Sequence, residues 1–234
     1  MTEHAAKDNQ RFTMNLLAFD TSTDQLSIAV QRGGERWTHD GPGGAQSSAT
    51  LIPAIHALLA QAGLEFTDLQ AIVFGRGPGS FTGLRTACSI AQGLAFGAGV
   101  PVLPVDTLLA VAEEARARHG CTAVLAALDA RMGEVYHAPY RWAEDGWHSE
   151  GEFGLCAPEA LCVPPGYTLA GNAQAAYGER LAAPLAVPAL PTAAALLRLA
   201  PALMAQAVPA AEALPLYVRD KVAQTTAERE AAKR

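Results

Sequence analysis

The sequence contains few charged and few aromatic residues, and it has no cluster of positive charge before residue 229. Charged residues make up 17% and aromatic residues 6% of its 234 residues, whereas 50% are hydrophobic. This composition is typical of a chain that folds around an apolar core and not of a disordered one. The formal net charge is −6, and lysine and arginine are scattered apart from Arg229, Lys233 and Arg234. Because phosphate neutralisation dominates RNA affinity, we do not expect the chain to bind RNA alone, and a role beside a basic subunit stays open.

Cysteine is scarce, and no segment is apolar enough for a membrane. The cysteines (Cys88, Cys121, Cys156 and Cys162) form no CxxC pair, so neither a disulfide framework nor a zinc site is indicated, and we expect reduced thiols. Residues 1–13 lack the apolar core of a signal peptide, and no apolar run approaches the roughly 20 residues that span a bilayer. We therefore expect a cytoplasmic protein with no membrane partner.

Hydrophobic periodicity predicts a first α/β lobe over residues 14–108. Strands are expected over 16–20, 26–31, 35–39, 70–75 and 100–105, and helices over 51–62, from Gly83 to Ala95 and over 108–118. The first three strands are joined by short turns and are antiparallel, whereas the later ones need helical crossovers and are parallel. This order resembles the ribonuclease-H-like lobe of the actin, sugar-kinase and Hsp70 (ASKHA) superfamily. Residues 41–44, rich in glycine and proline, are expected to form a loop.

The same pattern begins again in a smaller second lobe over residues 109–220. Strands are predicted over 123–129, 134–140, 147–153 and 167–170, with helices over 158–161 and 173–181. The repeat indicates a duplication with a truncated second lobe, in which Asp20 and Asp129 end equivalent strands. A Pro/Ala-rich linker over 182–191 leads to a helix over 192–207 that we expect to pack back on the first lobe. Residues 1–13 and 221–234 are expected to be flexible termini.

The most distinctive segment, GRGPGSFTGLR from Gly75 to Arg85, joins a buried strand to a helix. Free backbone N–H groups at a helix start can bind an anion, and a serine or threonine there can cap the helix or contact a phosphate. No GK[ST] follows, so the segment is not a Walker loop. Alternatively the glycines serve only a tight turn and close helix packing, and both interpretations stay open. The candidate anion or nucleotide residues are Asp20, Thr21, Ser22, Gly77, Gly79, Ser80 and Thr82.

Residues 77–85 (GPGSFTGLR) resemble the signature of the TsaB family. The resemblance extends to DTST at 20–23, DARMGEVY at 129–136 and PLYVR at 215–219, which together span most of the chain. It implies a two-lobed actin-like fold and a non-catalytic subunit that forms a heterodimer with TsaD through the paired helices of the first lobe. It further implies that TsaE joins the dimer and that TsaC supplies threonylcarbamoyl-adenylate. TsaD then modifies N6 of the adenosine beside the tRNA anticodon. ATP would be used by the partners, and tRNA would be met only through the complex.

The histidine pattern argues against catalysis. Metal-dependent relatives carry an HxxxH pair on the helix after the third strand, whereas here that helix has one unpaired histidine, His56. We therefore expect no metal and no tightly bound cofactor, and a metalloprotease activity is a poor fit. Asp20 and Asp129 would either organise a magnesium–nucleotide or cap the following turns, and we favour capping. Arg131 would either reach across the cleft or into a partner, or form a surface ion pair.

Small and apolar residues on the two helices of the first lobe predict a partner interface. Small residues let helix backbones approach closely, and exposed apolar stripes need cover. Ordinary burial against a sheet accounts for about half of this pattern. Two alternatives to the partner subunit are an actin-like ATPase or kinase acting alone through Asp20, and an inactive homodimeric scaffold. The predicted interface residues are Leu51, Ile55, Leu58, Leu59, Arg85, Ser89, Ile90 and Gly93.

Overall fold

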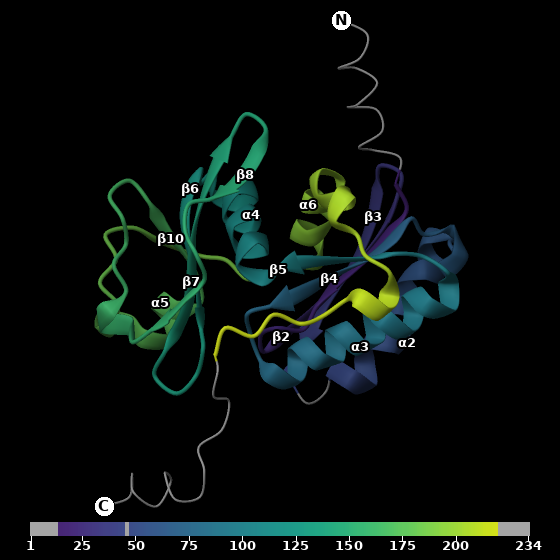
Figure 1. Cartoon of the computed structure of the whole chain (residues 1–234), viewed down its shortest axis with the longest axis horizontal. Coiled ribbons are helices and arrows are strands. Elements are labelled where there is room, and N and C mark those ends of the chain that lie inside the picture. The colour runs from purple at the N-terminus through teal and green to yellow at the C-terminus, as the bar shows by residue number, and fades with distance from the viewer. Residues whose placement is uncertain (1–13, 45–46, 220–234) are drawn as a thin grey trace, which may run out of the picture.

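The chain folds into two α/β lobes that lie side by side, seen in a computed structural model that describes residues 14–44 and 47–219 (Figure 1). The first lobe has a five-stranded sheet in the order β3-β2-β1-β4-β5, and the second has the path β11-β10-β6-β7-β8, with β9 paired to β7. Read from β8, the second sheet has the same order as the first. The predicted internal duplication is therefore visible in the topology. The predicted termini, 1–13 and 221–234, lie outside the described residues.

The first lobe follows the predicted element order. Strands β1 and β2 pair antiparallel with Phe19 opposite Ile28, and β1 pairs parallel with β4 with Leu17 opposite Ile72. The third strand runs through Gly41 to Pro42, residues that we expected in a loop. The strands are β1 (Leu16–Asp20), β2 (Gln25–Arg32), β3 (Glu35–Pro42), β4 (Ala71–Gly77) and β5 (Val102–Asp106). The helices are α2 (Ser47–Ala62), η2 (Phe66–Asp68) and α3 (Phe81–Ala98).

The second lobe is smaller because its crossovers are short. Between its third and fourth main strands, β8 and β10, it has the short strand β9 and a single 3₁₀ turn, where the first lobe has α2. Its last strand, β11, lies inside the segment 182–191 that we predicted as a linker, so that prediction was wrong. Three residues containing a proline make an edge strand that composition does not reveal. The elements are β6 (Ala123–Asp129), β7 (Val135–Ala143), β8 (Gly146–Ser149), β9 (Gly154–Cys156), η3 (Pro158–Ala160), β10 (Thr168–Gly171), α5 (Ala173–Tyr177), η4 (Gly178–Arg180) and β11 (Ala186–Pro188).

Each lobe ends in a helix that covers the sheet of the other lobe. Helix α4 (Thr107–His119) follows β5 but packs its Leu108, Val111 and Ala115 against β6 and β7. Helix α6 (Ala193–Leu203) follows β11 but packs against β1, β2, β4 and β5 of the first lobe, with Leu196 and Leu197 fully buried. The two helices also contact each other between the sheets (Figure 1). The exchange joins the lobes through two apolar cores.

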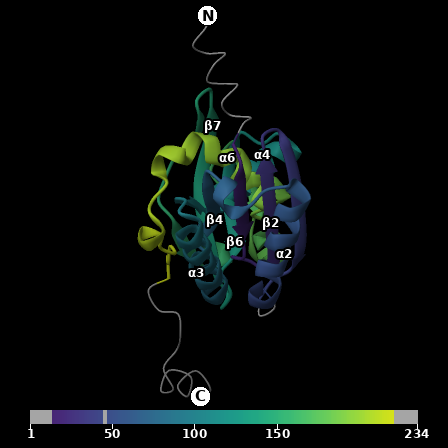
Figure 2. The same cartoon turned by 90° about the vertical axis from the view of Figure 1, so that its right-hand side faces the viewer.

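The opposite face of the first sheet is covered by α2 and α3 (Figure 2). Four predicted interface residues lie in this core: Leu51, Ile55, Leu58 and Leu59 are at most 4% exposed. Their assignment to a partner surface was therefore wrong. Both the core stripe and an interface stripe recur at helical spacing, and here the sheet occupies that stripe.

After α6, the chain returns along the first lobe. It forms the short turns η5 (Met204–Gln206) and η6 (Ala210–Glu212), and then runs beside α3 toward the contact between the lobes (Figure 1). Cys88 Sγ and Gln92 Nε2 donate to the carbonyl of Ala213, at 3.3 and 2.9 Å. In the described ranges, no helix is both long and apolar enough to cross a membrane.

Candidate functional site

A cleft of about 280 Å³ lies where the turns after β1 and β6 face each other. Its walls come from the β1–β2 turn (residues 22–24), the start of α3 (79–81), the β6–β7 turn (128–132) and Arg219. The duplication places equivalent turns on its two sides. Of the seven candidate anion residues, Ser22, Gly79 and Ser80 line this cleft.

Asp20 does not point into the cleft. It is 1% exposed, and its Oδ1 accepts hydrogen bonds from Ser22 N at 2.8 Å and Ser22 Oγ at 2.6 Å. Its Oδ2 is buried with no hydrogen-bond partner in the described part of the chain, and a Cβ on Gly75 would lie 1.8 Å from it. Burial raises the pKa of Asp20 to about 6, although hydrogen bonds from Ser22 act in the other direction. The geometry is that of a turn cap, the interpretation of Asp20 that the sequence analysis favoured over a nucleotide site.

The glycine-rich segment packs against the β1–β2 turn. Ser80 N donates to Ser22 O at 2.7 Å, and Thr21 Oγ1 donates to Gly83 O at 2.7 Å. A Cβ on Gly79 would lie 2.6 Å from Ser22 O, and one on Gly83 would lie 1.9 Å from Thr21 O. These glycines therefore allow a close approach of two backbones, which is the packing alternative raised by the sequence.

Three further candidate residues also do not line the cleft. Thr21 is fully buried, and Gly77, with a φ of 124°, has the carbonyl of Leu216 where a Cβ would stand, 2.4 Å away. Thr82 is exposed on α3 and does not line the cleft. Ser80 caps α3 by accepting from Gly83 N at 3.4 Å, so two of the N–H groups expected to meet an anion, those of Ser80 and Gly83, are already bonded.

The β6–β7 turn carries a contact across the cleft. Arg131 forms ion pairs with Asp24 of the first lobe and, at 3.1 Å, with Asp129 of its own turn. Its backbone N–H donates to Asp129 Oδ1 at 2.8 Å. The hydrogen bond with Asp24 is the main reason why the pKa of Arg131 is raised. Arg131 thus reaches across the cleft to Asp24 and also forms a surface ion pair with Asp129, so features of both predicted roles are present.

Two residues of this turn have left-handed backbones that only glycine adopts easily: Arg131 has a φ of 61° and Met132 of 57°. Tyr177 holds the turn by donating to Asp129 Oδ1 at 2.7 Å and to Glu134 O at 2.9 Å. Burial, followed by the bond to Asp129, raises the pKa of Tyr177 to about 12. Asp129 is thus a turn cap like Asp20.

The sequence analysis missed Arg219. Its guanidinium forms an ion pair with Glu134 and donates to the carbonyls of Ala130, at 3.2 Å, and Arg131, at 3.4 Å. Its side chain is only 12% exposed. The signal was present, since Arg219 ends the PLYVR segment that carried part of the family resemblance, but a lone arginine near the end of a chain indicates no partner. The tertiary fold brings that segment to the DARMGEVY turn.

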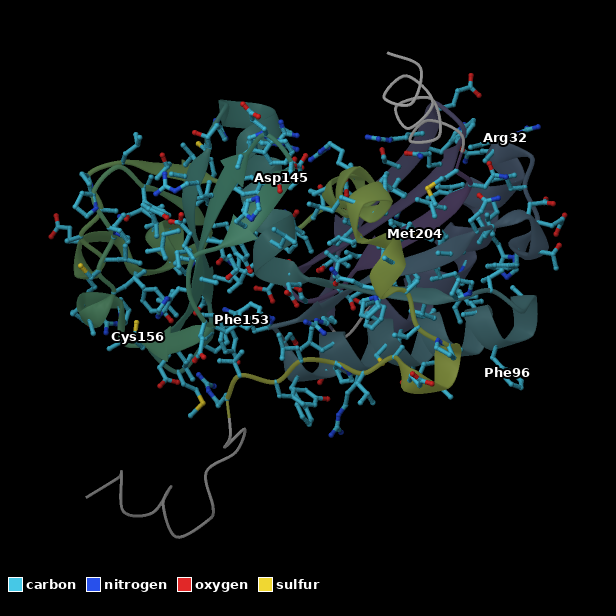
Figure 3. All side chains as sticks on the ribbon, turned by 45° about the horizontal axis from the view of Figure 1, so that its top comes forward. Arg32, Phe96, Asp145, Phe153, Cys156 and Met204 are labelled. Atoms are coloured by element: carbon cyan, nitrogen blue, oxygen red, sulfur yellow. The ribbon has the colours of Figure 1, made fainter. Side chains whose placement is uncertain are left out.

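The outer face of α3 carries the remaining predicted interface residues. Ser89 and Gly93 are exposed, and Ile90 is half-buried. Arg85 is exposed but makes contacts within the chain, since it stacks 3.9 Å over the ring of Phe81 and donates to Tyr217 Oη at 3.1 Å. Phe96, which the sequence analysis did not select, is 85% exposed and projects from the far end of α3 (Figure 3).

Comparison with known proteins agrees with this architecture. A family model described as TsaD, tRNA N6-adenosine threonylcarbamoyltransferase, matches residues 39–200. A solved structure titled YeaZ from Pseudomonas aeruginosa superimposes with a TM-score of 0.82 at 38% identity, covering 88% of this chain and 100% of that one. An uncharacterized protein of Mycobacterium tuberculosis is 34% identical over 210 residues, 87% of this chain and 91% of its own length.

The chain belongs to the TsaD-related family that includes the TsaB proteins. The tRNA threonylcarbamoyladenosine biosynthesis protein TsaB of Escherichia coli is 42% identical over 149 residues, and that of Haemophilus influenzae is 46% identical over 123 residues. These alignments cover 63% and 53% of this chain and 64% and 52% of the relatives, so the match spans between half and two thirds of each TsaB protein. The predicted actin-like fold is confirmed.

Within residues 14–44 and 47–219, no group of three or more His, Cys, Asp and Glu side chains is arranged to hold a metal ion. His56 packs edge-on against Phe66, with ring centroids 5.2 Å apart. The four cysteines are free thiols, of which Cys88 is buried.

Proposed function

We propose that this TsaB-like chain is a non-catalytic partner subunit. It pairs with a TsaD-type transferase and, with TsaE, supports transfer of a threonylcarbamoyl group to N6 of the adenosine beside the tRNA anticodon. In this proposal TsaC supplies threonylcarbamoyl-adenylate, the partners use ATP, tRNA is met only through the complex, and the setting is the cytoplasm. The names of the curated relatives support the pathway.

One observation carries the proposal: the groups that nucleotide chemistry would use are buried or bonded within the chain. The Asp20 carboxylate is buried against Gly75 and bound by Ser22. The start of α3 is packed against the β1–β2 turn, and the Arg131 guanidinium joins Asp24 to Asp129. A carboxylate that must hold a magnesium–nucleotide needs its oxygens in the cleft.

The outer face of α3 supports a closely packed partner. A Cβ on Gly93 or on Gly97 would meet nothing within 4 Å, so backbone is exposed there. Ser89 extends this small-residue surface, and the apolar Phe96 flanks it. The distance between packed helices is set by the side chains at their contact, so such a surface lets a partner helix approach closely.

Reconstitution tests the proposal. TsaC, TsaD and TsaE are combined with tRNA, threonine, bicarbonate and ATP, with and without this chain, and the modified adenosine is measured by mass spectrometry of digested tRNA. We expect modification to depend on the chain, and no turnover by the chain alone. Equal modification without the chain would show that it is not the required subunit.

A matched pair of variants locates the interface. Gly93→Arg places a long side chain on the outer face of α3 without an internal clash, since the position is open. Ala117→Arg introduces the same side chain at an exposed position near the end of α4. Only Gly93→Arg should abolish co-elution with TsaD in size-exclusion chromatography, with both thermal melts close to wild type. The same chromatography without TsaD reports whether the chain pairs with itself through this face.

An ATPase or kinase acting alone is the competing hypothesis. It requires ATP hydrolysis or phosphoryl transfer by the purified chain and loss of that activity in Asp20→Ala. Because Asp20 is buried and bonded to Ser22, we expect neither the wild-type chain nor the Asp20→Ala variant to hydrolyse ATP.

A further inference from the structure

A second pocket, of about 620 Å³, lies at the other end of the contact between the lobes. It is lined by the β2–β3 hairpin (Gln31 to Arg36), the β7–β8 hairpin (Trp142 to His148), α4 and α6. Strand β2, with eight residues, and β7, with nine, each run from the cleft to this pocket. At 3.3 Å per residue the two sites are roughly 25 Å apart. In the described part of the chain, they share no lining residue.

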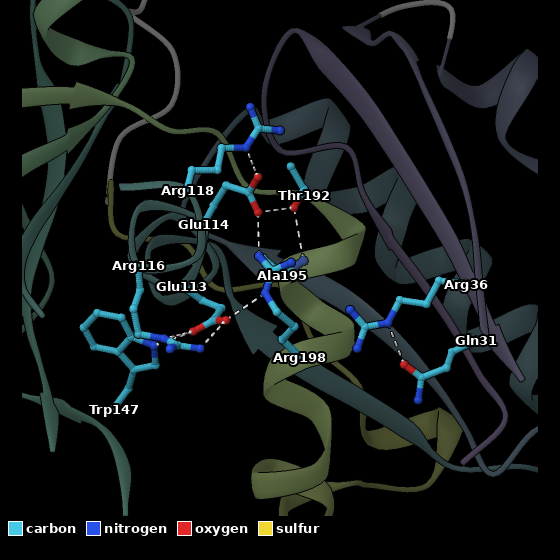
Figure 4. Close-up of polar contacts among 10 residues, drawn as sticks. All are labelled: Gln31, Arg36, Glu113, Glu114, Arg116, Arg118, Trp147, Thr192, Ala195 and Arg198. Carbon is cyan, nitrogen blue, oxygen red and sulfur yellow. Dashed lines mark hydrogen bonds and ion pairs between the residues drawn. The ribbon is translucent and has the colours of Figure 1, made fainter. Parts of the chain in front are cut away.

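The floor of the pocket is a buried carboxylate bound by several donors (Figure 4). Glu113, with a side chain that is 2% exposed, accepts from Arg116 Nε at 2.9 Å, Arg198 Nε at 2.7 Å and Trp147 Nε1 at 2.9 Å. Burial by itself would raise the pKa of Glu113, but the hydrogen bonds from Arg116, Trp147 and Arg198 lower it. Glu113 is therefore ionised, and it holds two guanidinium groups in fixed positions.

The positive and negative charges of the lining lie on different walls: the arginines are on β3, α4 and α6, and two of the three carboxylates, Glu144 and Asp145, are on the β7–β8 turn. Arg116, Arg118 and Arg198 form ion pairs with Glu113 and Glu114, whereas Arg36 lies apart from them beside Gln31 (Figure 4). The hydrogen bond of Arg36 is to Gln31 Oε1, at 2.9 Å, and it forms no ion pair with any described residue.

Free donors remain on three of these arginines. Among the described residues, no acceptor is bonded to the terminal nitrogens of Arg36 or to Nη1 of Arg116 and Arg198. Partial burial and then the nearby charge of Arg198 lower the pKa of Arg36, against an opposite effect of Glu113. A bound anion would relieve this repulsion and accept the free N–H groups.

The rest of the wall is aromatic and apolar. Trp142 and Trp147 both line the pocket, with ring centroids 5.5 Å apart, and the Arg116 guanidinium lies 4.0 Å from the Trp142 centroid. Leu109 and Leu199 add aliphatic surface. The acidic residues at the rim are on the β7–β8 turn, where Asp145 pairs with His148 at 2.7 Å. They direct an anion away from that turn and toward Arg36 on the opposite wall.

We propose that this pocket binds a planar aromatic molecule that carries a carboxylate or phosphate group. The anionic group lies at Arg36 and Arg198, and the ring lies against Trp142 and Trp147. Because the walls belong to both lobes, the ligand bridges them. The site does not depend on the function proposed above, since it shares no residue with the cleft or with the outer face of α3.

Tryptophan signals give a direct test. The chain has three tryptophans, so the ¹⁵N-labelled protein shows three indole N–H signals in a heteronuclear NMR spectrum. Two belong to the pocket, whereas Trp37 packs against the core of the first lobe. On titration with 1-naphthoate or 1-naphthyl phosphate we expect the Trp142 and Trp147 signals to move saturably and Trp37 to stay. The tighter of the two probes identifies the anionic group. The neutral 1-naphthalenemethanol, acetate and inorganic phosphate should bind at least about tenfold more weakly.

Variants assign the anion contact. Arg36→Gln should lower the affinity for the naphthyl anions by about tenfold, because it removes one charged hydrogen bond. Arg36→Lys should restore part of this affinity, because it keeps the positive charge. The matched control Arg131→Gln, which changes the cleft, should leave the affinity unchanged. A thermal melt close to that of wild type shows that the variants are folded.

Three results would overturn the proposal. The Trp142 and Trp147 signals could stay fixed at millimolar concentrations of both naphthyl anions. The neutral alcohol could bind as tightly as the anions, which would make the pocket merely apolar. The affinity could depend on Arg131 and not on Arg36, which would place the ligand in the cleft.

Discussion

The buried carboxylate of Asp20 makes the stability of the protein depend on pH in an unusual direction. Burial raises its pKa from 3.8 to about 6, so the folded protein holds the proton more tightly than the unfolded chain does. The stability that this group contributes is fully present below about pH 3.8 and is lost as the pH rises through about 6. Asp20→Asn keeps the shape and the oxygen that accepts from Ser22 but does not titrate. Its advantage over Asp20 therefore grows with pH.

The size of the effect follows from linkage. One pKa unit corresponds to about 1.4 kcal/mol, and the two pKa values give a difference of about 1 kcal/mol at pH 4.5 and about 3 kcal/mol at pH 7.5. The free energy of unfolding of Asp20→Asn relative to wild type should thus increase by about 2 kcal/mol between these pH values. The free-energy cost of burying the amide of the Asp20→Asn variant is the same at both pH values, so it cancels when the two differences are compared.

Urea unfolding followed by tryptophan fluorescence measures the free energy of unfolding of both proteins at about pH 4.5 and about pH 7.5. The control Asp40→Asn changes an exposed carboxylate on β3, and its stability relative to wild type should differ by less than about 0.5 kcal/mol between the two pH values. If the advantage of Asp20→Asn is constant with pH, or shrinks as the pH rises, the carboxylate is not buried as described.

Two further predictions concern stability. Gly83→Ala should destabilise the fold by about 2 kcal/mol or more in the same urea assay, because its Cβ would lie 1.9 Å from Thr21 O, whereas Gly97→Ala, at an open helical position, should stabilise by up to about 1 kcal/mol. Equal effects of the two alanines would refute the packing role of the glycine segment. Glu113→Gln leaves the Arg116 and Arg198 guanidinium groups without their shared buried carboxylate, so it should cost about 3–5 kcal/mol and lower the melting temperature measured by circular dichroism. A change below 1 kcal/mol would show that the network is not structural.

Local pattern was enough for most of the strands and helices. Strand β1 is a buried apolar run that ends in an acid, and its copy β6 repeats that form, so both the duplication and the equivalence of Asp20 and Asp129 could be predicted. The glycine segment could be recognised, but whether its glycines serve an anion or a neighbouring backbone could not. That depends on the β1–β2 turn, whose Thr21 and Ser22 carbonyls occupy the space beside α3.

Residues that meet from distant parts of the chain were the ones missed. Arg219 reaches a turn 85 positions earlier at Glu134, and the pocket arginines come from β3, α4 and α6. Helical spacing marked Leu58 and Leu59 as apolar neighbours, but it could not say whether a sheet or a partner covers them.

The sequence by itself determined most of the elements, their order, the repeat and the family, because periodicity and turn residues act over a few neighbouring positions. Only the tertiary structure decided which sheet each helix covers. An apolar stripe specifies that a face is buried but not against what. For example, α4 covers the sheet of the second lobe and α6 that of the first, which brings Glu113 of α4 beside Arg198 of α6.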